Sequence, residues 1–223
     1  MTKELIIAID GPAGAGKSTI SRRVAENLNY LFIDTGAMYR AVAWKIVNLG
    51  INFSDQESIV KVAQQSRIEL KGKPNSQQVF IDDHEITSDI RTPQAGRAAS
   101  IVSAISGVRR ALVAQQQQMG RQGGVVLEGR DIGTAVFPNA DVKFYLDASV
   151  ETRALRRFQE DGVKGILTTL EATTDDIIER DKRDMNRLDS PLVKAEDAIY
   201  IDTSDMNIDQ VITKMLEMIE SRK

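Results

Sequence analysis

The stretch that decides the fold is Gly11-Pro12-Ala13-Gly14-Ala15-Gly16-Lys17-Ser18. It fits the pattern G-x-x-x-x-G-K-[ST] and directly follows the apolar, strand-like run Leu5–Ile9. Glycines let the backbone bend so that several N–H groups point inward, and a helix that starts here adds the positive end of its dipole. The stretch therefore predicts a phosphate-binding loop, in which Lys17 supplies a mobile charge and Ser18 a hydroxyl ligand for Mg²⁺.

A phosphate-binding loop is shared by kinases, GTPases and motor ATPases, so other features must separate these classes. A guanine-reading N-K-x-D element normally follows a strand. The nearest match, Asp181-Lys182-Arg183-Asp184, lies in a charged helical pattern and starts with the wrong residue. The sequence therefore argues against a GTPase.

Short apolar runs alternate with longer helical patterns along the whole chain, which is typical of a parallel sheet with crossover helices. The strands are near-continuous apolar runs, as expected when helices cover both faces of the sheet. We predict strands at Leu5–Ile9, Leu31–Ile33, Val125–Leu127, Val142–Leu146 and Ala198–Ile201. We predict helices at Ser18–Leu28, Thr35–Leu49, Val108–Met119, Val150–Glu160, Asp175–Arg187 and Ile208–Ile219.

The second and third predicted strands are about 90 residues apart, which is far more than one crossover needs. Part of this segment is helical in pattern, but residues 67–92 have short alternating runs broken by Gly72 and Pro74. The alternation predicts a small antiparallel insert; a disordered linker is the alternative. We expect one domain over residues 1–223, with this insert on it.

Composition excludes several kinds of chemistry. The 223 residues contain no cysteine, so disulfides and thiolate sites are absent, and the single histidine, His84, lies in a polar, turn-like stretch. The net charge of −3 predicts no general attraction to nucleic acid or to anionic membranes. No apolar run approaches membrane-spanning length, and the start of the chain is unlike a signal peptide, so we expect a cytoplasmic protein.

Two polar blocks follow predicted strands and should meet in one cleft, because ligands of open α/β sheets bind at the carboxyl ends of the strands. The first block is Asp34–Arg40, in which Arg40 can hold a phosphate with two parallel hydrogen bonds. Its alternative is a helix start capped by Asp34 or Thr35, with Tyr39 in the core. The second block is Glu128–Thr134, whose Arg130 and Asp131 form either a ligand site or a surface ion pair.

Two groups of charged residues lie at helical spacing further along the chain. Arg153, Arg156 and Arg157 share one helical face before the glycine-containing, mobile-looking stretch Gln159–Gly165. They indicate a lid over transferring phosphate, at residues 153–165; a solvated basic face is the alternative. Arg180, Asp184 and Arg187 also share one face, where a helix that salt-bridges itself is an equally good explanation.

With these pieces in place, the chain resembles the bacterial cytidylate kinases over essentially its full length. The phosphate-binding loop is common to many families, but the remaining blocks in this order are highly specific. They are Ile9–Pro12, Asp34–Arg40, Ile90–Thr92, Gly129–Thr134, Glu179–Asp181, Arg183–Asp184, Arg187 and Ser190–Leu192. The resemblance implies the P-loop nucleoside monophosphate kinase fold: a five-stranded parallel sheet flanked by helices, a β-containing CMP-side insert at 67–92 and a short lid at 153–165.

The resemblance also implies an enzyme that moves the γ-phosphoryl group of ATP to CMP or dCMP with the help of Mg²⁺, and that acts as a monomer. Its implied catalytic residues are Lys17, Arg130, Arg153 and Arg157. ATP would be held by Gly11, Pro12, Ala13, Gly14, Ala15, Gly16, Lys17, Ser18, Thr19 and Arg156, and Mg²⁺ by Ser18.

The implied acceptor site has three parts. Ser100, Arg109 and Asp131 would read the base, Arg180 and Asp184 would hold the ribose, and Arg40, Arg130 and Arg187 would clamp the phosphate, with Thr35 and Tyr39 beside them. The family usually has aspartate where this chain has Glu128, which leaves a role of that position near the metal open.

This reaction suits a chain without catalytic histidine or cysteine. A phosphate monoester has its second pKa near 6 and is already largely a dianion at neutral pH, so it needs no general base. Two alternatives remain from other classes: a kinase for another small acceptor, such as shikimate or a different nucleotide, and a non-catalytic ATP-binding switch.

Overall fold

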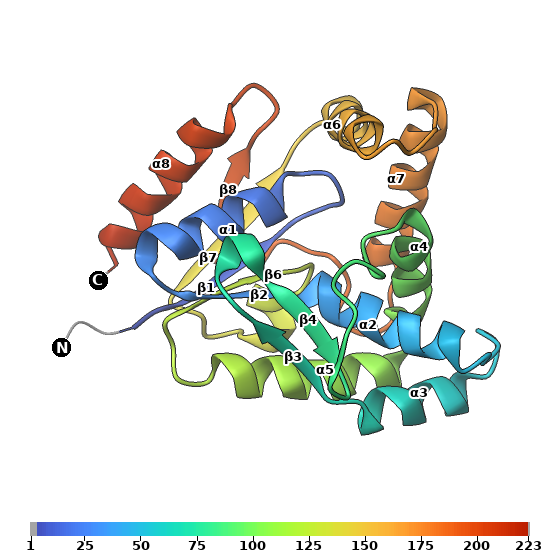
Figure 1. Cartoon of the computed structure of the whole chain (residues 1–223). Helices are drawn as coiled ribbons and strands as arrows, with labels where there is room; N and C mark the ends of the chain where they lie inside the picture. Colours follow the sequence, from blue (N-terminus) through green and yellow to red (C-terminus); the bar gives the residue numbers. More distant parts are fainter. Residues whose placement is uncertain (1–3, 223) are drawn as a thin grey trace.

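Five parallel strands form the central sheet in the computed structural model, which describes residues 4–222 (Figure 1). They are β1 (Ile6–Asp10), β2 (Leu31–Asp34), β6 (Val125–Glu128), β7 (Val142–Asp147) and β8 (Ile199–Asp202). Their order in the sheet is β2-β6-β1-β7-β8, and every neighbouring pair is parallel. The predicted five-stranded parallel sheet is confirmed, with each strand within one residue of its expected bounds.

The described residues also form eight α-helices. Six correspond to predicted helices: α1 (Lys17–Leu28), α2 (Thr35–Asn48), α5 (Ser106–Gly120), α6 (Val150–Val163), α7 (Leu170–Met185) and α8 (Ile208–Glu220). The other two, α3 (Gln56–Gln65) and α4 (Pro93–Val102), lie in the long segment between β2 and β6, which was predicted to be partly helical but without bounds. A short 3₁₀ turn, η1 (Pro74–Ser76), and a π-helical turn, η2 (Ile132–Val136), complete the elements. None of these helices is long and apolar enough to cross a membrane.

The alternation of side chains along β1 divides the interior into two apolar layers. Leu5, Ile7 and Ile9 pack on one face against α1 and α8, whereas Ile6 and Ala8 pack on the other against α2 and α5. Figure 1 shows α1 and α8 on one side of the sheet and α2, α3 and α5 on the other. Because both faces are covered, the carboxyl ends of the strands are the part of the sheet that remains for polar loops.

The insert contains a second, antiparallel sheet. Its strands are β3 (Ile68–Lys71), β4 (Gln78–Ile81) and β5 (His84–Glu85), and β4 pairs with both of the others. Val79 and Ile81 are buried in the apolar layer that includes α2, so the segment is folded rather than a disordered linker. Its part in nucleotide binding stays a prediction.

The segment that carries the lid arginines is more regular than its glycines suggested. Helix α6 continues through Gly162 to Val163, and only Lys164 and Gly165, with φ of +71°, form the turn that follows. Helix α7 starts at Leu170, five residues before the predicted start, because the Thr169 side chain accepts a hydrogen bond from Ala172 N and caps it. The stretch Gln159–Gly165 is therefore mostly helical, and its movement as part of a lid stays a prediction.

The phosphate-binding loop starts by packing tightly against the sheet. Gly11 has a φ of +145°, and a Cβ atom placed on it would lie 1.9 Å from the Leu146 backbone oxygen of β7. Only glycine fits here, because any side chain would collide with backbone that cannot move without disturbing the sheet.

We expect Gly11→Ala to lower the free energy of unfolding by about 3 kcal/mol or more, as backbone strain and overpacking add. The matched control is Gly162→Ala in α6, where a Cβ atom would have no described atom within 4 Å. That change should stabilise the protein by about 0.5–1 kcal/mol. Urea unfolding followed by circular dichroism measures both; equal effects of the two substitutions would contradict the packing described here.

Candidate active site

The phosphate-binding loop joins β1 to α1 as predicted, and its lysine is buried. Gly16, with φ of +82°, takes the N-cap position of α1, and no side chain caps this helix. The Lys17 Nζ donates to Pro12 O at 2.6 Å. Burial, together with the charge of Arg130, holds the pKa of Lys17 well below its usual range. An uncapped helix start beside a buried cation favours an anionic ligand.

The loop after β2 is built around one carboxylate. Asp34 caps α2 by accepting from Ala37 N at 2.7 Å, and its other oxygen accepts from Arg40 at 3.0 Å. Burial alone would raise the pKa of Asp34, but Arg40 and the Ala37 N–H hold it below its usual value. The helix-cap explanation and the ligand explanation of this block therefore both apply, because the capping carboxylate is also the residue that orients Arg40.

The loop after β6 is held by a second carboxylate. Asp10, at the end of β1, accepts from the backbone N–H groups of Ile132 and Gly133, both at 2.8 Å. Burial raises the pKa of Asp10 to about 6, although these two donors act in the opposite direction. The contact fixes the Glu128–Thr134 loop to the strand that leads into the phosphate-binding loop.

Asp131 forms a buried ion pair with Arg109, and not the surface pair with Arg130 that was considered as an alternative. Both residues are at most 5% exposed, and the pair joins α5 to the loop after β6. The Arg109 guanidinium also lies 5.6 Å from the centre of the Tyr39 ring, and burial raises the pKa of that phenol to about 12. Two buried groups of opposite charge side by side can offer a planar ligand one donor and one acceptor.

Asp184 connects α7 to the same place. It accepts from Arg130 Nε at 2.9 Å and also pairs with Arg187, two residues after the end of its helix. Burial alone would raise its pKa, but Arg130 and Arg187 hold it below its usual value. The ion pairs of α7 are therefore not confined to neighbouring residues, since the Asp184 carboxylate also binds an arginine 54 positions earlier in the chain.

Two further contacts link α4 and its C-cap residue Ser103 to α7 and the residues that follow it, and neither was predicted. Arg183 donates to the Ser100 hydroxyl at 2.8 Å, and Arg187 donates to the Ser103 hydroxyl at 2.9 Å. Sequence spacing placed Arg183 next to Asp184 but could not show that it holds Ser100. Ser103, one turn after Ser100 on the same helix, was missed entirely.

A cavity brings most of the predicted acceptor residues together. Its lining contains Thr35, Tyr39, Ser100, Arg109, Arg130, Asp131, Arg180, Asp184 and Arg187, with Gly36, Ala99, Ser103 and Gly129. Arg40 is not in the lining, but its guanidinium lies next to Gly36, where an added Cβ would be 3.3 Å from Arg40 Nη1. All ten predicted acceptor residues therefore lie in or beside one site.

This site has an excess of positive charge. Five arginines, Arg40, Arg109, Arg130, Arg180 and Arg187, face three aspartates, Asp34, Asp131 and Asp184. The Nε atoms of four of these arginines, all but Arg130, are buried and make no hydrogen bond within residues 4–222. Burial and the neighbouring charge of Arg130 lower the pKa of Arg180 to about 10. Buried donors without partners are costly, so the site favours an anion that supplies acceptors.

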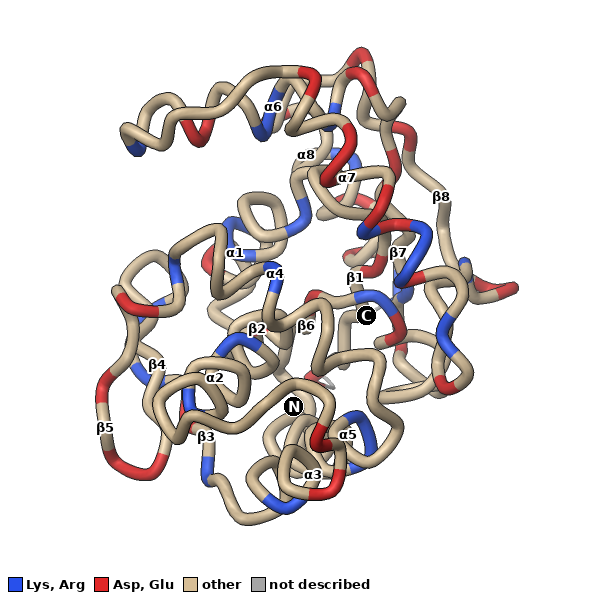
Figure 2. Tube along the Cα trace, turned by 90° about the vertical axis from the view of Figure 1, so that its right-hand side faces the viewer, with Lys and Arg blue, Asp and Glu red and all other residues tan. Residues whose placement is uncertain are grey.

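The three lid arginines have different partners although they share a helix. Arg153 is buried and pairs with Asp181 of α7. Arg156 donates to the hydroxyl and backbone oxygen of Thr203, at 3.0 and 2.6 Å, and Arg157 pairs with Asp161 at 3.0 Å. Figure 2 shows basic and acidic positions following one another along α7, which is where Asp181 lies. The common role of the three arginines stays a prediction.

Glu128 lies where a divalent cation could be held. It is 4% exposed, the Ser18 side chain is among the neighbours that lower its pKa, and its Oε2 atom makes no hydrogen bond within residues 4–222. Burial, and then the charge of Asp34, raises the pKa of Glu128 to about 7. A serine hydroxyl with a carboxylate oxygen beside it fits Mg²⁺, which takes its remaining oxygens from phosphates and water. Within the described part of the chain no three acidic or histidine side chains could hold a metal by themselves.

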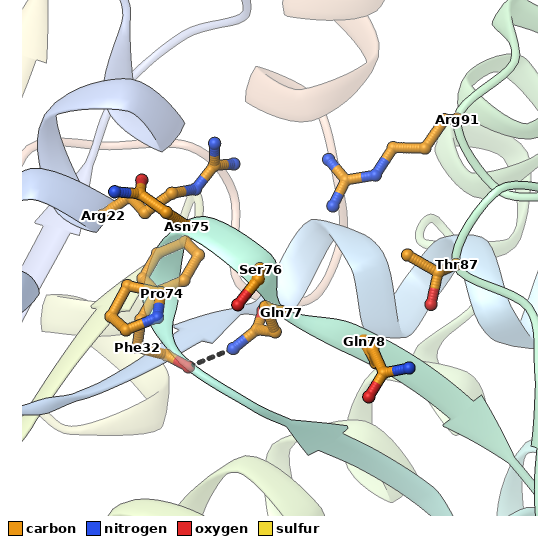
Figure 3. Close-up of a pocket in the computed structure, with 9 residues that line it drawn as sticks. All are labelled: Arg22, Phe32, Pro74, Asn75, Ser76, Gln77, Gln78, Thr87 and Arg91. Carbon is orange, nitrogen blue, oxygen red and sulfur yellow. Dashed lines mark hydrogen bonds between the residues drawn. The ribbon is translucent and has the colours of Figure 1, made fainter.

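A larger cavity, of about 370 Å³, lies between α1 and the insert (Figure 3). Arg22 and Arg91 line it, and the Gln77 amide donates to Phe32 O at 2.7 Å, which ties the insert to β2. None of the predicted site residues lines this cavity. We therefore take the smaller, arginine-rich cavity as the candidate active site.

Comparison with known proteins shows which family the chain belongs to. A model of the cytidylate kinase family matches residues 7–221, nearly the whole chain. The chain belongs to the cytidylate kinase family. Curated relatives that carry this name align end to end with it. The protein of Desulforamulus reducens is 48% identical over 223 residues, and the alignment covers 100% of both chains. The proteins of Ligilactobacillus salivarius and Bacillus subtilis are 47% and 46% identical, and each alignment covers 100% of this chain and 99% of the relative.

Solved structures show that this cytidylate kinase family member shares its fold with other P-loop kinases. A shikimate kinase from Acinetobacter baumannii aligns with a TM-score of 0.50 at 20% identity, covering 100% of this chain and 96% of that one. An uncharacterized protein from Eubacterium ventriosum aligns with a TM-score of 0.57 at 13% identity, covering 98% and 99%. At these identities the likeness concerns the fold alone.

The buried Asp10 carboxyl makes the effect of its substitution depend on pH. Its folded pKa of about 6 exceeds the ordinary aspartate value of 3.8, so the folded protein keeps a proton that the unfolded chain loses as pH rises between these values. The free energy of unfolding of the wild type therefore falls over that range. That of Asp10→Asn does not fall for this reason, because asparagine has no proton to lose there. The destabilisation caused by Asp10→Asn should therefore be smaller near pH 7.5 than near pH 4 by roughly 2–3 kcal/mol.

Urea unfolding of wild type and Asp10→Asn at both pH values measures this difference. Asp175→Asn, an exposed position on α7, is the matched control for the loss of one carboxylate. A destabilisation by Asp10→Asn that is constant with pH, or that grows as pH rises, would contradict the assignment.

Proposed function

We propose that this protein transfers the γ-phosphoryl group of ATP to CMP, and to dCMP, giving CDP or dCDP and ADP. The observation that carries the proposal is the arginine-rich cavity beside the phosphate-binding loop, in a chain of the cytidylate kinase family. Such a site must hold a second anion next to the donor phosphates, and a nucleoside monophosphate is the acceptor that this family's name implies.

The acceptor nucleotide would be held at three places in the cavity. Asp131 would accept from the cytosine amino group and Arg109 would donate to N3 or O2, which suits their buried pair. Ser100 completes the base site. Arg180 and Asp184 would contact the ribose, and the phosphate would be clamped by Arg40, Arg130 and Arg187, whose charges exceed those of their carboxylate partners.

The donor would lie on the loop Gly11–Thr19. The N–H groups at the start of α1 would bind its phosphates, and Lys17 would leave Pro12 O to reach them. Arg157 would approach the transferring group, and Arg156, which is anchored at Thr203 after β8, would lie beside the nucleotide. Ser18, with Glu128 behind it, would hold Mg²⁺, which when bound neutralises charge on the donor phosphates.

The protein residues would act by alignment and by neutralising charge. The acceptor phosphate is already a nucleophile at neutral pH, so no side chain has to remove a proton. Lys17 and the arginines offset the repulsion between two polyanions and hold them in line. The insert at 67–92 and the lid at 153–165 would close on the two nucleotides and exclude water, which protects ATP from hydrolysis. We further propose that the protein acts as a monomer in the cytoplasm.

Two other functions are less well supported. A kinase for shikimate would share this fold, but shikimate has no base for Arg109 and Asp131 to read. A non-catalytic ATP-binding switch would have no use for several buried arginines at a second anion site.

A coupled assay of ADP release with CMP, dCMP, UMP, AMP, GMP and shikimate tests the proposed function. We expect kcat/KM for CMP to exceed that for UMP by about a hundredfold, because uracil inverts the donor and acceptor at two buried contacts. Shikimate should give only the rate without acceptor. Equal turnover of all nucleotides, or no ADP release with CMP, would overturn the proposal.

Asp131→Asn tests the base reader. The amide oxygen can still accept from Arg109, while its NH₂ can donate to the uracil carbonyl, so the repulsion of uracil is removed. We expect kcat/KM for CMP to fall and the UMP-to-CMP ratio of kcat/KM to rise at least about tenfold. Steady-state kinetics measures both. Asp189→Asn, outside the cavity lining, is the control and should leave the ratio unchanged; an unchanged ratio in Asp131→Asn would show that Asp131 does not read the base.

A further inference from the structure

Two residues, one on α6 and one on α7, hold the tip of the phosphate-binding loop. Asp181 Oδ1, on α7, accepts from Ala13 N at 3.1 Å, and Arg153 Nη1, on α6, donates to Ala13 O at 2.9 Å. Arg153 and Asp181 also pair with each other. Both polar groups of the Ala13 backbone are thus bound by a single ion pair. We propose that this pair, the loop clamp, positions the phosphate-binding loop for ATP, and that Asp181 is a positioning residue.

The loop clamp is buried and is held in place by further backbone contacts. Ala13, Arg153 and Asp181 are each 5–6% exposed. Arg153 Nε also donates to Ala148 O at 2.9 Å, which fixes the guanidinium to the junction between β7 and α6. A Cβ atom on Gly14 would lie 3.0 Å from Arg153 O, so the loop lies directly on the backbone of α6. A pair fixed in this way can select one orientation of the peptide groups on either side of Ala13.

That orientation matters for the rest of the loop. Gly14 and Gly16 have φ of +78° and +82°, and glycine-rich backbone has other conformations of similar energy. Rotation of the peptide group between Pro12 and Ala13 would turn the Ala13 N–H away from Asp181 and change the direction of the loop that follows. By binding both sides of Ala13, the loop clamp removes this freedom before ATP arrives, and preorganisation of this kind favours binding.

The charges of the loop clamp explain why it is a pair. A lone carboxylate next to the phosphate-binding loop would repel ATP, and it would be costly to bury. Arg153 neutralises Asp181 and has its own hydrogen bonds to Ala148 O and Ala13 O. In this arrangement Arg153 acts on the donor through the loop. This differs from the direct contact with the transferring phosphoryl group that the sequence suggested for it, and the two roles give different double-mutant results.

ATP affinity is measured by titration with a fluorescent ATP analogue, alongside KM for ATP, KM for CMP and the melting temperature. Asp181→Ala should weaken ATP binding by about tenfold and leave KM for CMP within about twofold. Asp181→Asn should weaken it less, because the amide oxygen can still accept from Ala13 N. Asp175→Asn, an exposed carboxylate on the same helix, should bind the analogue like wild type.

The deciding comparison is Arg153→Met with and without Asp181→Asn. Arg153→Met alone leaves an unpaired carboxylate beside the loop, so adding Asp181→Asn should restore several-fold of the lost ATP affinity. Arg153→Lys alone should keep most of the wild-type ATP affinity. If Arg153 contacts the phosphates directly, the two substitutions should instead multiply their losses, which would overturn the proposal. Both Asn and Lys are close in size to the native residues, so these variants remain informative if Asp181→Ala does not fold.

The proposal is also overturned if Asp181→Ala binds the analogue within twofold of wild type, or if KM for ATP and CMP rise together as the melting temperature falls. It rests on the loop being the ATP site. Binding of the analogue to wild type and turnover of CMP by wild type test that premise separately.

Discussion

The electrostatic cost of holding several arginines in one enclosed cavity constrains much of this molecule. Guanidinium groups without partners are expensive to bury, and Arg40, Arg109, Arg130 and Arg187 each pair with a buried carboxylate. These carboxylates come from the end of β2, from the loop after β6 and from α7. The same ion pairs that make the cavity tolerable therefore also fix these parts of the chain relative to one another.

The buried aspartates each have a second task, which explains how a short chain positions so many groups. Asp34 caps α2 while it orients Arg40, and Asp10 ties the loop after β6 to the strand that leads into the phosphate-binding loop. Asp181 binds the Ala13 backbone while it neutralises Arg153. As a result, the donor loop and the acceptor cavity are parts of one network at the carboxyl edge of the sheet.

The sequence was sufficient for the sheet and the loop, because near-continuous apolar runs and a glycine-rich motif are local signals. The segment between β2 and β6 was predicted to be partly helical, but helix α4 was given no bounds although Thr92 followed by Pro93 is a helix-start signal. Helix α3 was given none because its apolar stripe is narrow, with only Ile59, Val62 and Ala63 buried. The residues of the acceptor site were predicted from family-specific blocks of sequence. Helical spacing could not predict them, because it shows which residues share a helix face but not which other segment packs against that face. Arg153 illustrates the limit: its partners Asp181, Ala13 and Ala148 lie on three other segments.

The chain carries a net charge of −3, yet the cavity carries excess positive charge. This contrast follows from the task of a phosphoryl-transfer site that uses no general base. Attraction over the whole surface would favour any polyanion, whereas arginines kept inside a cavity act only on a ligand small enough to enter it. Their carboxylate partners limit the cost while no ligand is bound, and within residues 4–222 they leave buried Nε donors to which an entering anion can offer acceptors. Under the proposed function, selectivity for a small phosphate ester would thus arise from where the charge is buried, and not from how much of it the protein has.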